Sequence, residues 1–179
     1  QLLAADGQGR MAKAGLIALA LLAATPAAAQ IVADSEMLTA ADPARIAEVV
    51  TAYGRPATLE TDEAGDPSIA TGFGGIRGRI WFYDCDANGQ NCVGLQFQIG
   101  IGTTAKLSLA QVNEFNRGRR FATLSLDEEG DPILSHDLSM ARPGISAASF
   151  RDTLRLFDTQ AGELRKLVED LERADPKAP

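Results

Sequence analysis

The chain has 179 residues, of which 45% are hydrophobic, and a formal net charge of −7 at pH 7. This length and composition suit one globular domain with an ordinary apolar core. An acidic chain repels phosphate backbones, and no basic stripe in the sequence offsets that repulsion, so the composition argues against nucleic-acid binding.

The N-terminal region carries the pattern of a secretory signal peptide. Met11 precedes a lysine and a short apolar run, which ends in an A-x-A cleavage site ahead of Gln30. As a helix this run spans about 24 Å, short of the roughly 30 Å of hydrocarbon in a bilayer, so a membrane anchor fits less well. We expect residues 11–29 to be removed, residues 1–10 to be an upstream extension, and the mature protein to be periplasmic or secreted without a stable membrane anchor.

The folded domain is predicted to span residues 42–174, with residues 30–41 as a linker and residues 175–179 as a tail. Its first helix, over residues 43–53, begins where Asp42 offers an N-cap followed by a proline at the first helical position. Apolar residues then recur with helical spacing until a glycine stops the helix.

Two polar strands follow this helix. Residues 57–61 and 68–72 predict a weak hairpin typical of a sheet edge. The glycine-rich segment FGGIRG comes next, and it lacks the spacing of a phosphate-binding loop and does not open a helix. It therefore predicts a bend in the chain.

The clearest pattern is the strict alternation over residues 93–101, where every odd position is apolar. A period of two predicts an antiparallel strand with one buried face. The residues of the opposite face are small or polar: Gly94, Gln96, Gln98, Gly100 and Gly102. Residues 80–83 form the natural partner strand, and Asn88-Gly89 between them is a strong turn signal.

Cys85 and Cys92 flank this turn and are the two cysteines of the chain. In an oxidising compartment such a pair forms a disulfide. The spacing is not the C-x-x-C of a redox centre, and with His136 as the only histidine a zinc tetrad lacks ligands. We expect a structural disulfide, no metal and no cofactor.

Calcium binding is an alternative for the same loop. Asp84, Asp86, Asn88 and Gly89 match the opening of a D-x-[DN]-x-[DN]-G calcium loop. The twelfth position is Leu95 instead of glutamate, and the flanking segments are strands instead of helices. A polar hairpin turn is favoured, and calcium or small-ligand binding stays open as the alternative.

A second pair of strands follows a short helix. Ser108 is a candidate N-cap for that helix, which ends near residues 116–118. Residues 121–126 and 133–136 then form strands on either side of the turn DEEGDP, and Ser146 offers the N-cap of the last helix.

The last helix is predicted over residues 147–174, with Gly162 as the place where it bends or ends early. Its length of about 42 Å exceeds the roughly 24 Å width of a five-stranded sheet. The end of its apolar stripe, Leu164, Val168 and Leu171, is therefore expected to meet a protein partner or a second copy in a homodimer, or else to fold back as core.

The order of elements is helix, four strands, helix, two strands and helix. This order predicts an α+β fold in which helices lie on one face of a twisted antiparallel sheet.

Two long segments, FYDCDANGQNCVGLQFQIGI and VNEFNRGRRFATLSLDEEGDPILSHDLSM, resemble the YbjN family of small bacterial proteins, and the resemblance extends over residues 42–171. It implies a fold like that of type III secretion chaperones, often paired into dimers. The family is labelled a sensory-transduction regulator and has no catalytic residues to transfer.

These observations favour an exported, non-enzymatic protein that binds other proteins as a chaperone-like or regulatory module. The tripeptide Ser135-His136-Asp137 is not a catalytic triad, because neighbours in a strand point to opposite faces. An uncharacterised enzyme remains an alternative.

Overall fold

The computed structural model describes residues 32–174. The predicted upstream extension, signal peptide and C-terminal tail lie outside the described residues. Six strands build the main sheet: β2 (Thr58–Thr61), β3 (Pro67–Phe73), β4 (Ile76–Tyr83), β5 (Gly94–Gly100), β6 (Thr123–Leu126) and β7 (Pro132–Ser139). Three helices accompany them: α1 (Pro43–Ala52), α2 (Leu109–Arg117) and α3 (Ala147–Ala174). In the described part of the chain, no helix combines the length and apolar character needed to span a membrane.

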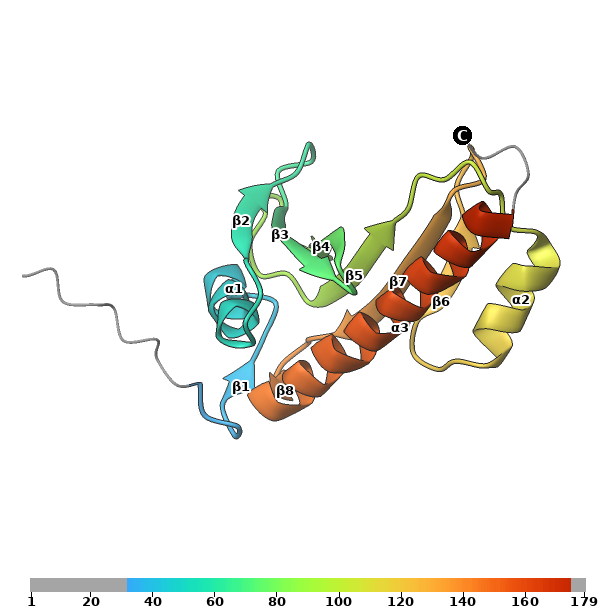
Figure 1. Cartoon of the computed structure of the whole chain (residues 1–179). Helices are drawn as coiled ribbons and strands as arrows, with labels where there is room; N and C mark the ends of the chain where they lie inside the picture. The colour runs from blue at the N-terminus through green and yellow to red at the C-terminus, as the bar shows by residue number, and fades with distance from the viewer. Residues whose placement is uncertain (1–31, 175–179) are drawn as a thin grey trace, which may run out of the picture.

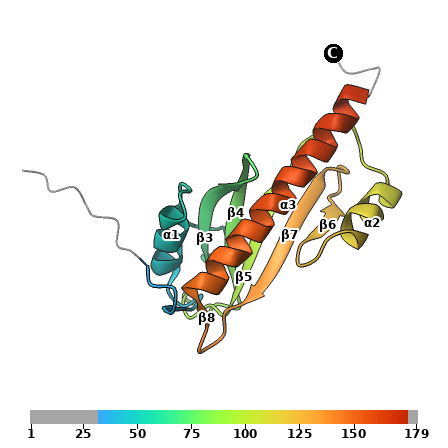
Figure 2. The ribbon, with the colours of Figure 1, turned by 60° about the horizontal axis from the view of Figure 1, so that its bottom comes forward.

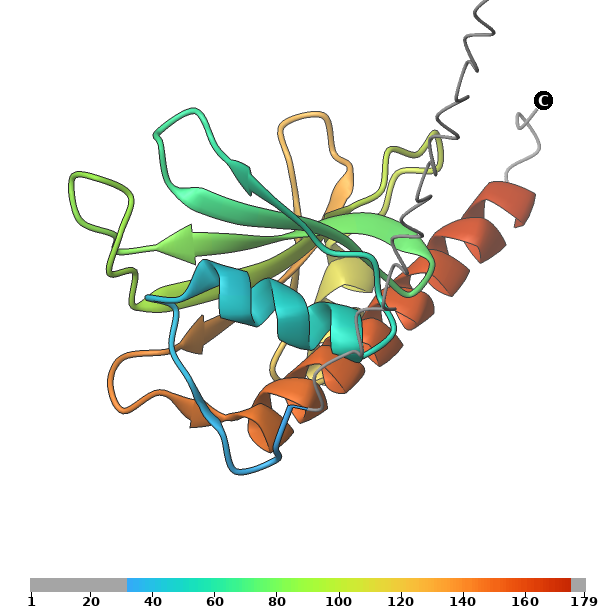
Figure 3. The same cartoon turned by 90° about the vertical axis from the view of Figure 1, so that its left-hand side faces the viewer.

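The main sheet has the strand order β2-β3-β4-β5-β7-β6, and every neighbouring pair is antiparallel. Figure 1 shows α3 lying along this sheet, and Figure 2 shows α1 and α2 on either side of α3. Seen from the side in Figure 3, α1 and α3 lie next to each other on one side of the strands. The predicted α+β fold with helices on one face of an antiparallel sheet is confirmed.

One face of the sheet is apolar, as the alternation over residues 93–101 predicts. Phe97 stands opposite Ile80 in the register, and both side chains are fully buried. Phe97 also packs against two phenylalanines of α3, with ring centroids 5.9 Å from Phe150 and 5.8 Å from Phe157. Aromatic pairs at such distances stabilise a core beyond their buried area, so this cluster holds α3 to the sheet.

Three hairpin turns share the pattern D-x-x-G, and in each of them the aspartate side chain stabilises the turn. In each turn the aspartate Oδ1 accepts the backbone N–H four residues on, and the glycine takes a positive φ. The aspartates are Asp62, Asp86 and Asp127, and the glycines are Gly65, Gly89 and Gly130. Aspartate side chains favour such local bonds, and glycine adopts the left-handed conformation without strain, so the sequence itself sets these turns.

The FGGIRG bend proves to be the turn between β3 and β4, and it docks on α3. Gly74 donates its N–H to Asp158 Oδ1 at 2.7 Å, and Arg165 Nε donates to the Gly74 carbonyl at 2.9 Å. Gly162 faces this turn in the middle of α3, which continues unbroken to Ala174. The prediction that the helix bends or ends early at Gly162 is therefore wrong.

The prediction of a linker over residues 30–41 is also wrong for its described part. Residues 37–38 form β1 (Met37–Leu38), which pairs with β8 (Ile145–Ser146), and the side chain of Leu38 is buried. A two-residue strand is too short to produce a periodic pattern in the sequence.

Candidate functional site: the open face of the sheet

The face of the sheet turned away from α1 and α3 is covered by no helix within residues 32–174. We call it the open face. The antiparallel register places its side chains side by side on neighbouring strands. They are Glu60 on β2, Arg77, Arg79, Trp81 and Tyr83 on β4, Gln96 and Gln98 on β5, and Asp137 on β7.

A line of hydrogen bonds crosses the open face from β4 to β7. Trp81 Nε1 donates to Gln98 Oε1 at 3.0 Å, and Gln98 Nε2 reaches Gln96 Oε1 at 3.4 Å. Gln96 Nε2 in turn donates to Asp137 Oδ1 at 2.8 Å. Because each side chain orients the next, the polar surface between Trp81 and Asp137 is held in one arrangement.

Arg79 completes the surface on the β2 side. Its guanidinium lies 5.0 Å from the centre of the Trp81 ring and donates to Glu60 Oε2 at 2.6 Å and to Ser68 Oγ at 2.8 Å. Ser68 is fully buried in spite of facing the open side. The arginine therefore covers the strand beneath it and packs over the face of the tryptophan ring in a cation–π contact.

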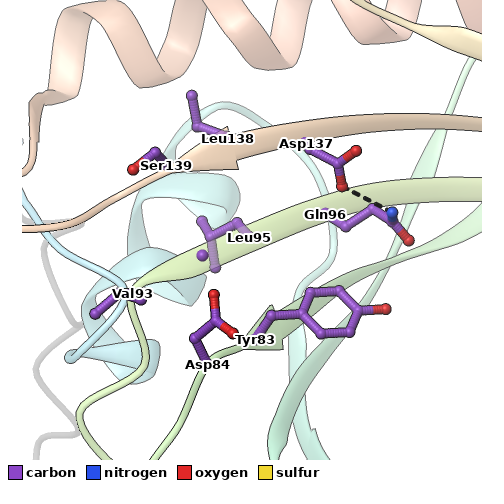
Figure 4. Close-up of a pocket in the computed structure, with 9 residues that line it drawn as sticks. Tyr83, Asp84, Val93, Leu95, Gln96, Asp137, Leu138 and Ser139 are labelled. Atoms are coloured by element: carbon purple, nitrogen blue, oxygen red, sulfur yellow. Dashed lines mark hydrogen bonds between the residues drawn. The ribbon is translucent and has the colours of Figure 1, made fainter.

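Beside this surface lies a shallow hollow of about 580 Å³, lined in part by Tyr83. Figure 4 shows Tyr83, Asp84, Gln96 and Asp137 around it. Tyr83 is 45% exposed, a large value for an aromatic side chain. The pKa of its phenol is raised, first by partial burial and then by the negative charges of Asp137 and Asp62. The Tyr83 phenol therefore stays uncharged near the carboxylates of Asp137 on β7 and Asp62 in the β2–β3 turn.

Two more hollows make the charge of the open face uneven. One of about 500 Å³ is lined by acidic residues of β2 and its turn together with Trp81. Another, of about 370 Å³ at the opposite end of β4, is lined by Arg77 and Arg79. The open face is therefore acidic at the end where β4 meets the β4–β5 turn, and basic at the other end.

Sequence reasoning found only part of this surface. The alternation in β5 correctly turned Gln96 and Gln98 away from the core. Arg79, Trp81 and Tyr83 were missed as a group, although their spacing of two in a strand was a usable signal. Asp137 joins them only through the pairing of β5 with β7, which no local pattern reveals.

The two cysteines lie where they were predicted. Cys85 and Cys92 are at disulfide distance across the β4–β5 turn, and Cys92 is buried in the hydrophobic core. The pair lies in the loop beyond the ends of the two strands, so its place in the fold is a structural one.

The apolar stripe at the end of α3 lies in the chain's own core. Leu164 is fully buried, Val168 is 3% exposed, and Leu171 packs against the same core as a partly buried residue. The segment before α2 reaches this end of the helix, where Thr103 Oγ1 donates to Glu172 at 2.6 Å. This segment covers the part of α3 that extends beyond the strands, so the prediction that these three side chains contact a partner is replaced by its alternative, folding back as core.

In the β4–β5 turn, which carries the calcium-loop pattern, the carboxylate of Asp86 accepts hydrogen bonds from the loop itself. Asp86 Oδ1 accepts the N–H groups of Asn88 and Gln90, and Oδ2 accepts Asn91 Nδ2 at 2.7 Å. These bonds lower the pKa of Asp86, with the Asn91 bond the largest cause. Among residues 32–174 no three histidine, cysteine or acidic side chains gather as metal ligands would.

The Ser135-His136-Asp137 tripeptide is split between the two faces of β7. His136 stands opposite Phe97 on the apolar side, with ring centroids 6.0 Å apart, whereas Asp137 bonds Gln96 on the open face. The His136 Nδ1 contacts the Phe121 carbonyl oxygen. The imidazole is therefore engaged with the backbone and not with Ser135 or Asp137.

Comparison with known proteins adds a family match and two similar structures. The YbjN family model, described as "Putative bacterial sensory transduction regulator", matches residues 42–169. The crystal structure of "YbjN, a putative transcription regulator from E. coli" is 13% identical, with a TM-score of 0.49 over 74% of this chain and 96% of that one. The Yersinia pestis type III secretion chaperone SycH, solved with a fragment of YscM2, is 16% identical, with a TM-score of 0.45 over 74% of this chain and 99% of that one. No curated protein matches the sequence.

Proposed function

Because this chain belongs to the YbjN family, whose description names a regulatory role and no reaction, we propose that it is a regulatory or chaperone-like module that binds a protein partner. The open face receives the partner. The single observation that carries this proposal is a preorganised polar and aromatic surface, from Arg79 through Trp81 to Asp137, on a sheet face that no described helix covers.

The composition of the open face supports a protein partner. Arginine, tryptophan and tyrosine are the residues that contribute most binding energy at protein interfaces, and Arg79, Trp81 and Tyr83 stand in line on β4. The side chains of Arg79 and Trp81 are already held by hydrogen bonds and a cation–π contact, so little conformational entropy is lost when they are covered.

Binding at a sheet edge is a less suitable mode. The β6 edge is occupied by α2, since Asn116 accepts the Leu124 N–H at 2.8 Å and donates to the Leu124 carbonyl at 3.0 Å. The opposite edge strand, β2, is only four residues long. Short edges are a common protection against unwanted strand pairing, which leaves the broad open face as the docking surface.

Export is the second part of the proposal. The signal pattern over residues 11–29 and the pairing of the two cysteines both favour an oxidising compartment outside the cytoplasm. Intact mass of the protein from a periplasmic extract tests this: we expect a mature chain beginning at Gln30. A chain that keeps Met11 in the cytoplasmic fraction refutes export and leaves the binding proposal standing.

Site-specific photocrosslinking in the native host tests the docking surface. A benzoylphenylalanine in place of Tyr83 or Gln96 reports contacts of the open face, and one in place of Leu109, 73% exposed on α2, is the matched control. We expect discrete protein adducts from the open-face positions and none from position 109. Equal adducts at all three positions, or none at the open face, contradict the proposed function.

A further inference from the structure

The acidic end of the open face determines what part of a partner can bind there. Asp84 and Asp137 line the hollow around Tyr83, and Glu60 and Asp62 line the neighbouring hollow beside Trp81. The only basic residue lining either hollow is Arg79, which Glu60 already engages.

The fold brings these carboxylates together from distant parts of the chain. The β2–β3 and β4–β5 turns pack against each other, so that a Cβ atom added at Gly89 would lie 3.2 Å from the Gly65 carbonyl carbon. This contact holds Asp62 on the side of Tyr83 opposite to β7, while the register of β5 with β7 sets Asp137 beside Gln96.

The carboxylates keep unused hydrogen-bonding capacity. Asp137 uses one oxygen for Gln96 and Asp62 uses one oxygen for its own turn. Within residues 32–174, Asp84 makes no hydrogen bond or ion pair through its side chain. These oxygens border a neutral, half-exposed tyrosine ring, the surroundings in which an ammonium or guanidinium gains both cation–π and ionic contacts.

We propose that the acidic end of the open face docks a basic, extended segment of the protein partner, with a lysine or arginine side chain over the Tyr83 ring between Asp137 and Asp62. This inference rests on the proposed function and names the chemistry of its partner. The long dimension of the surface, from Tyr83 back along β4 to Arg77, suits an extended segment whose basic part lies at the Tyr83 end and whose acidic part lies at the Arg77 end.

Trp81 is the only tryptophan of the chain and lies on this surface, so its fluorescence reports binding directly. The probe is a short peptide alternating lysine and threonine, compared with the same peptide carrying glutamine or glutamate in place of lysine. We expect a saturable change of Trp81 fluorescence with the lysine peptide that weakens as salt rises, and none with the other two. Free spermidine and calcium ions serve as the small-cation probes.

Two substitutions test the carboxylates without disturbing the fold. Asp137→Asn keeps the oxygen that accepts from Gln96, and Asp62→Asn keeps the oxygen that accepts in its turn. Each should weaken the lysine peptide about two- to five-fold, as expected for one exposed ionic contact. Asp127→Asn is the matched control, because Asp127 has the same role in the β6–β7 turn at the opposite end of the strands, and it should change nothing.

Several outcomes overturn the inference. The first is that the glutamine peptide binds as well as the lysine peptide, and the second is that Asp127→Asn weakens binding as much as the two test substitutions do. The third is that spermidine or calcium competes at a lower concentration than the peptide. Each outcome shows that the surface does not select a basic segment. If open-face adducts persist in the Asp62→Asn/Asp137→Asn double variant at the wild-type yield, the protein-binding function stands and only the basic chemistry of the partner fails. If the open-face positions give no adducts in the wild-type protein, both the protein-binding function and the basic partner are refuted.

Discussion

The contact between the β3–β4 turn and α3 predicts opposite effects for two glycines that face each other. A Cβ atom added at Gly74 would lie 2.6 Å from the carbonyl carbon of Ala161, and its φ of +59° is the left-handed conformation. A Cβ atom added at Gly162 would lie 3.9 Å from the Gly74 Cα, an ordinary van der Waals contact. The same added methyl group is therefore excluded on one side of the contact and accepted on the other.

The magnitudes follow from these two geometries. Gly74→Ala loses about 1–2 kcal/mol to left-handed strain and about 1.5–3 kcal/mol when the turn moves away from the Asp158 carboxylate, so we expect a loss of about 2.5–5 kcal/mol in the free energy of unfolding. Gly162→Ala removes a glycine from a helix interior and should add about 1 kcal/mol. In a domain of this size, 1 kcal/mol corresponds to about 2–4 °C in the melting temperature.

Urea unfolding followed by circular dichroism measures both effects. Gly54→Ala is the control for strain alone, because Gly54 has a φ of +88° and no atom within 4 Å of the added Cβ position. It should lose only about 1–2 kcal/mol. A Gly74→Ala loss no larger than that of Gly54→Ala, or a Gly162→Ala loss as large as that of Gly74→Ala, would contradict close docking of the β3–β4 turn on α3.

Three further predictions concern the disulfide, the core and the acid side of the stability profile. Replacing Cys85 and Cys92 together by serine should lower the free energy of unfolding by about 2.5 kcal/mol on the loop-entropy model without moving the Trp81 emission, and free thiols in the native protein would contradict the pairing. Leu164→Ala should lower the free energy of unfolding by about 2–5 kcal/mol in denaturant unfolding, because the Leu164 side chain is fully buried. An unchanged stability would show that Leu164 is not a core residue. Asp86 has a lowered pKa in the folded chain, so its contribution is present above the ordinary aspartate pKa and is lost as the pH falls through the lower folded value. Asp86→Asn should therefore melt below the wild type at neutral pH and converge with it in acid; a difference that persists in acid would assign the effect to shape instead of charge.

Local patterns determined most of the elements of this protein. The Asp42 and Ser108 caps, confirmed by their bonds to the backbone, placed the starts of α1 and α2. The alternation over residues 93–101 placed β5 and its two faces. These features are readable because each depends on residues within a few positions of one another, and short-range steric and hydrogen-bonding preferences act there with little help from the rest of the fold.

Tertiary structure decided what these elements meet. Leu164 and Val168 are core residues because the segment before α2 comes over the end of α3, and Gly74 must be a glycine because the β3–β4 turn docks closely on α3. Asp62 and Asp137 both act on the Tyr83 phenol because strand pairing and the packing of two turns bring them near it across 75 residues of sequence. Contacts of this kind depend on the register and twist of the whole sheet, which no single segment of the sequence encodes.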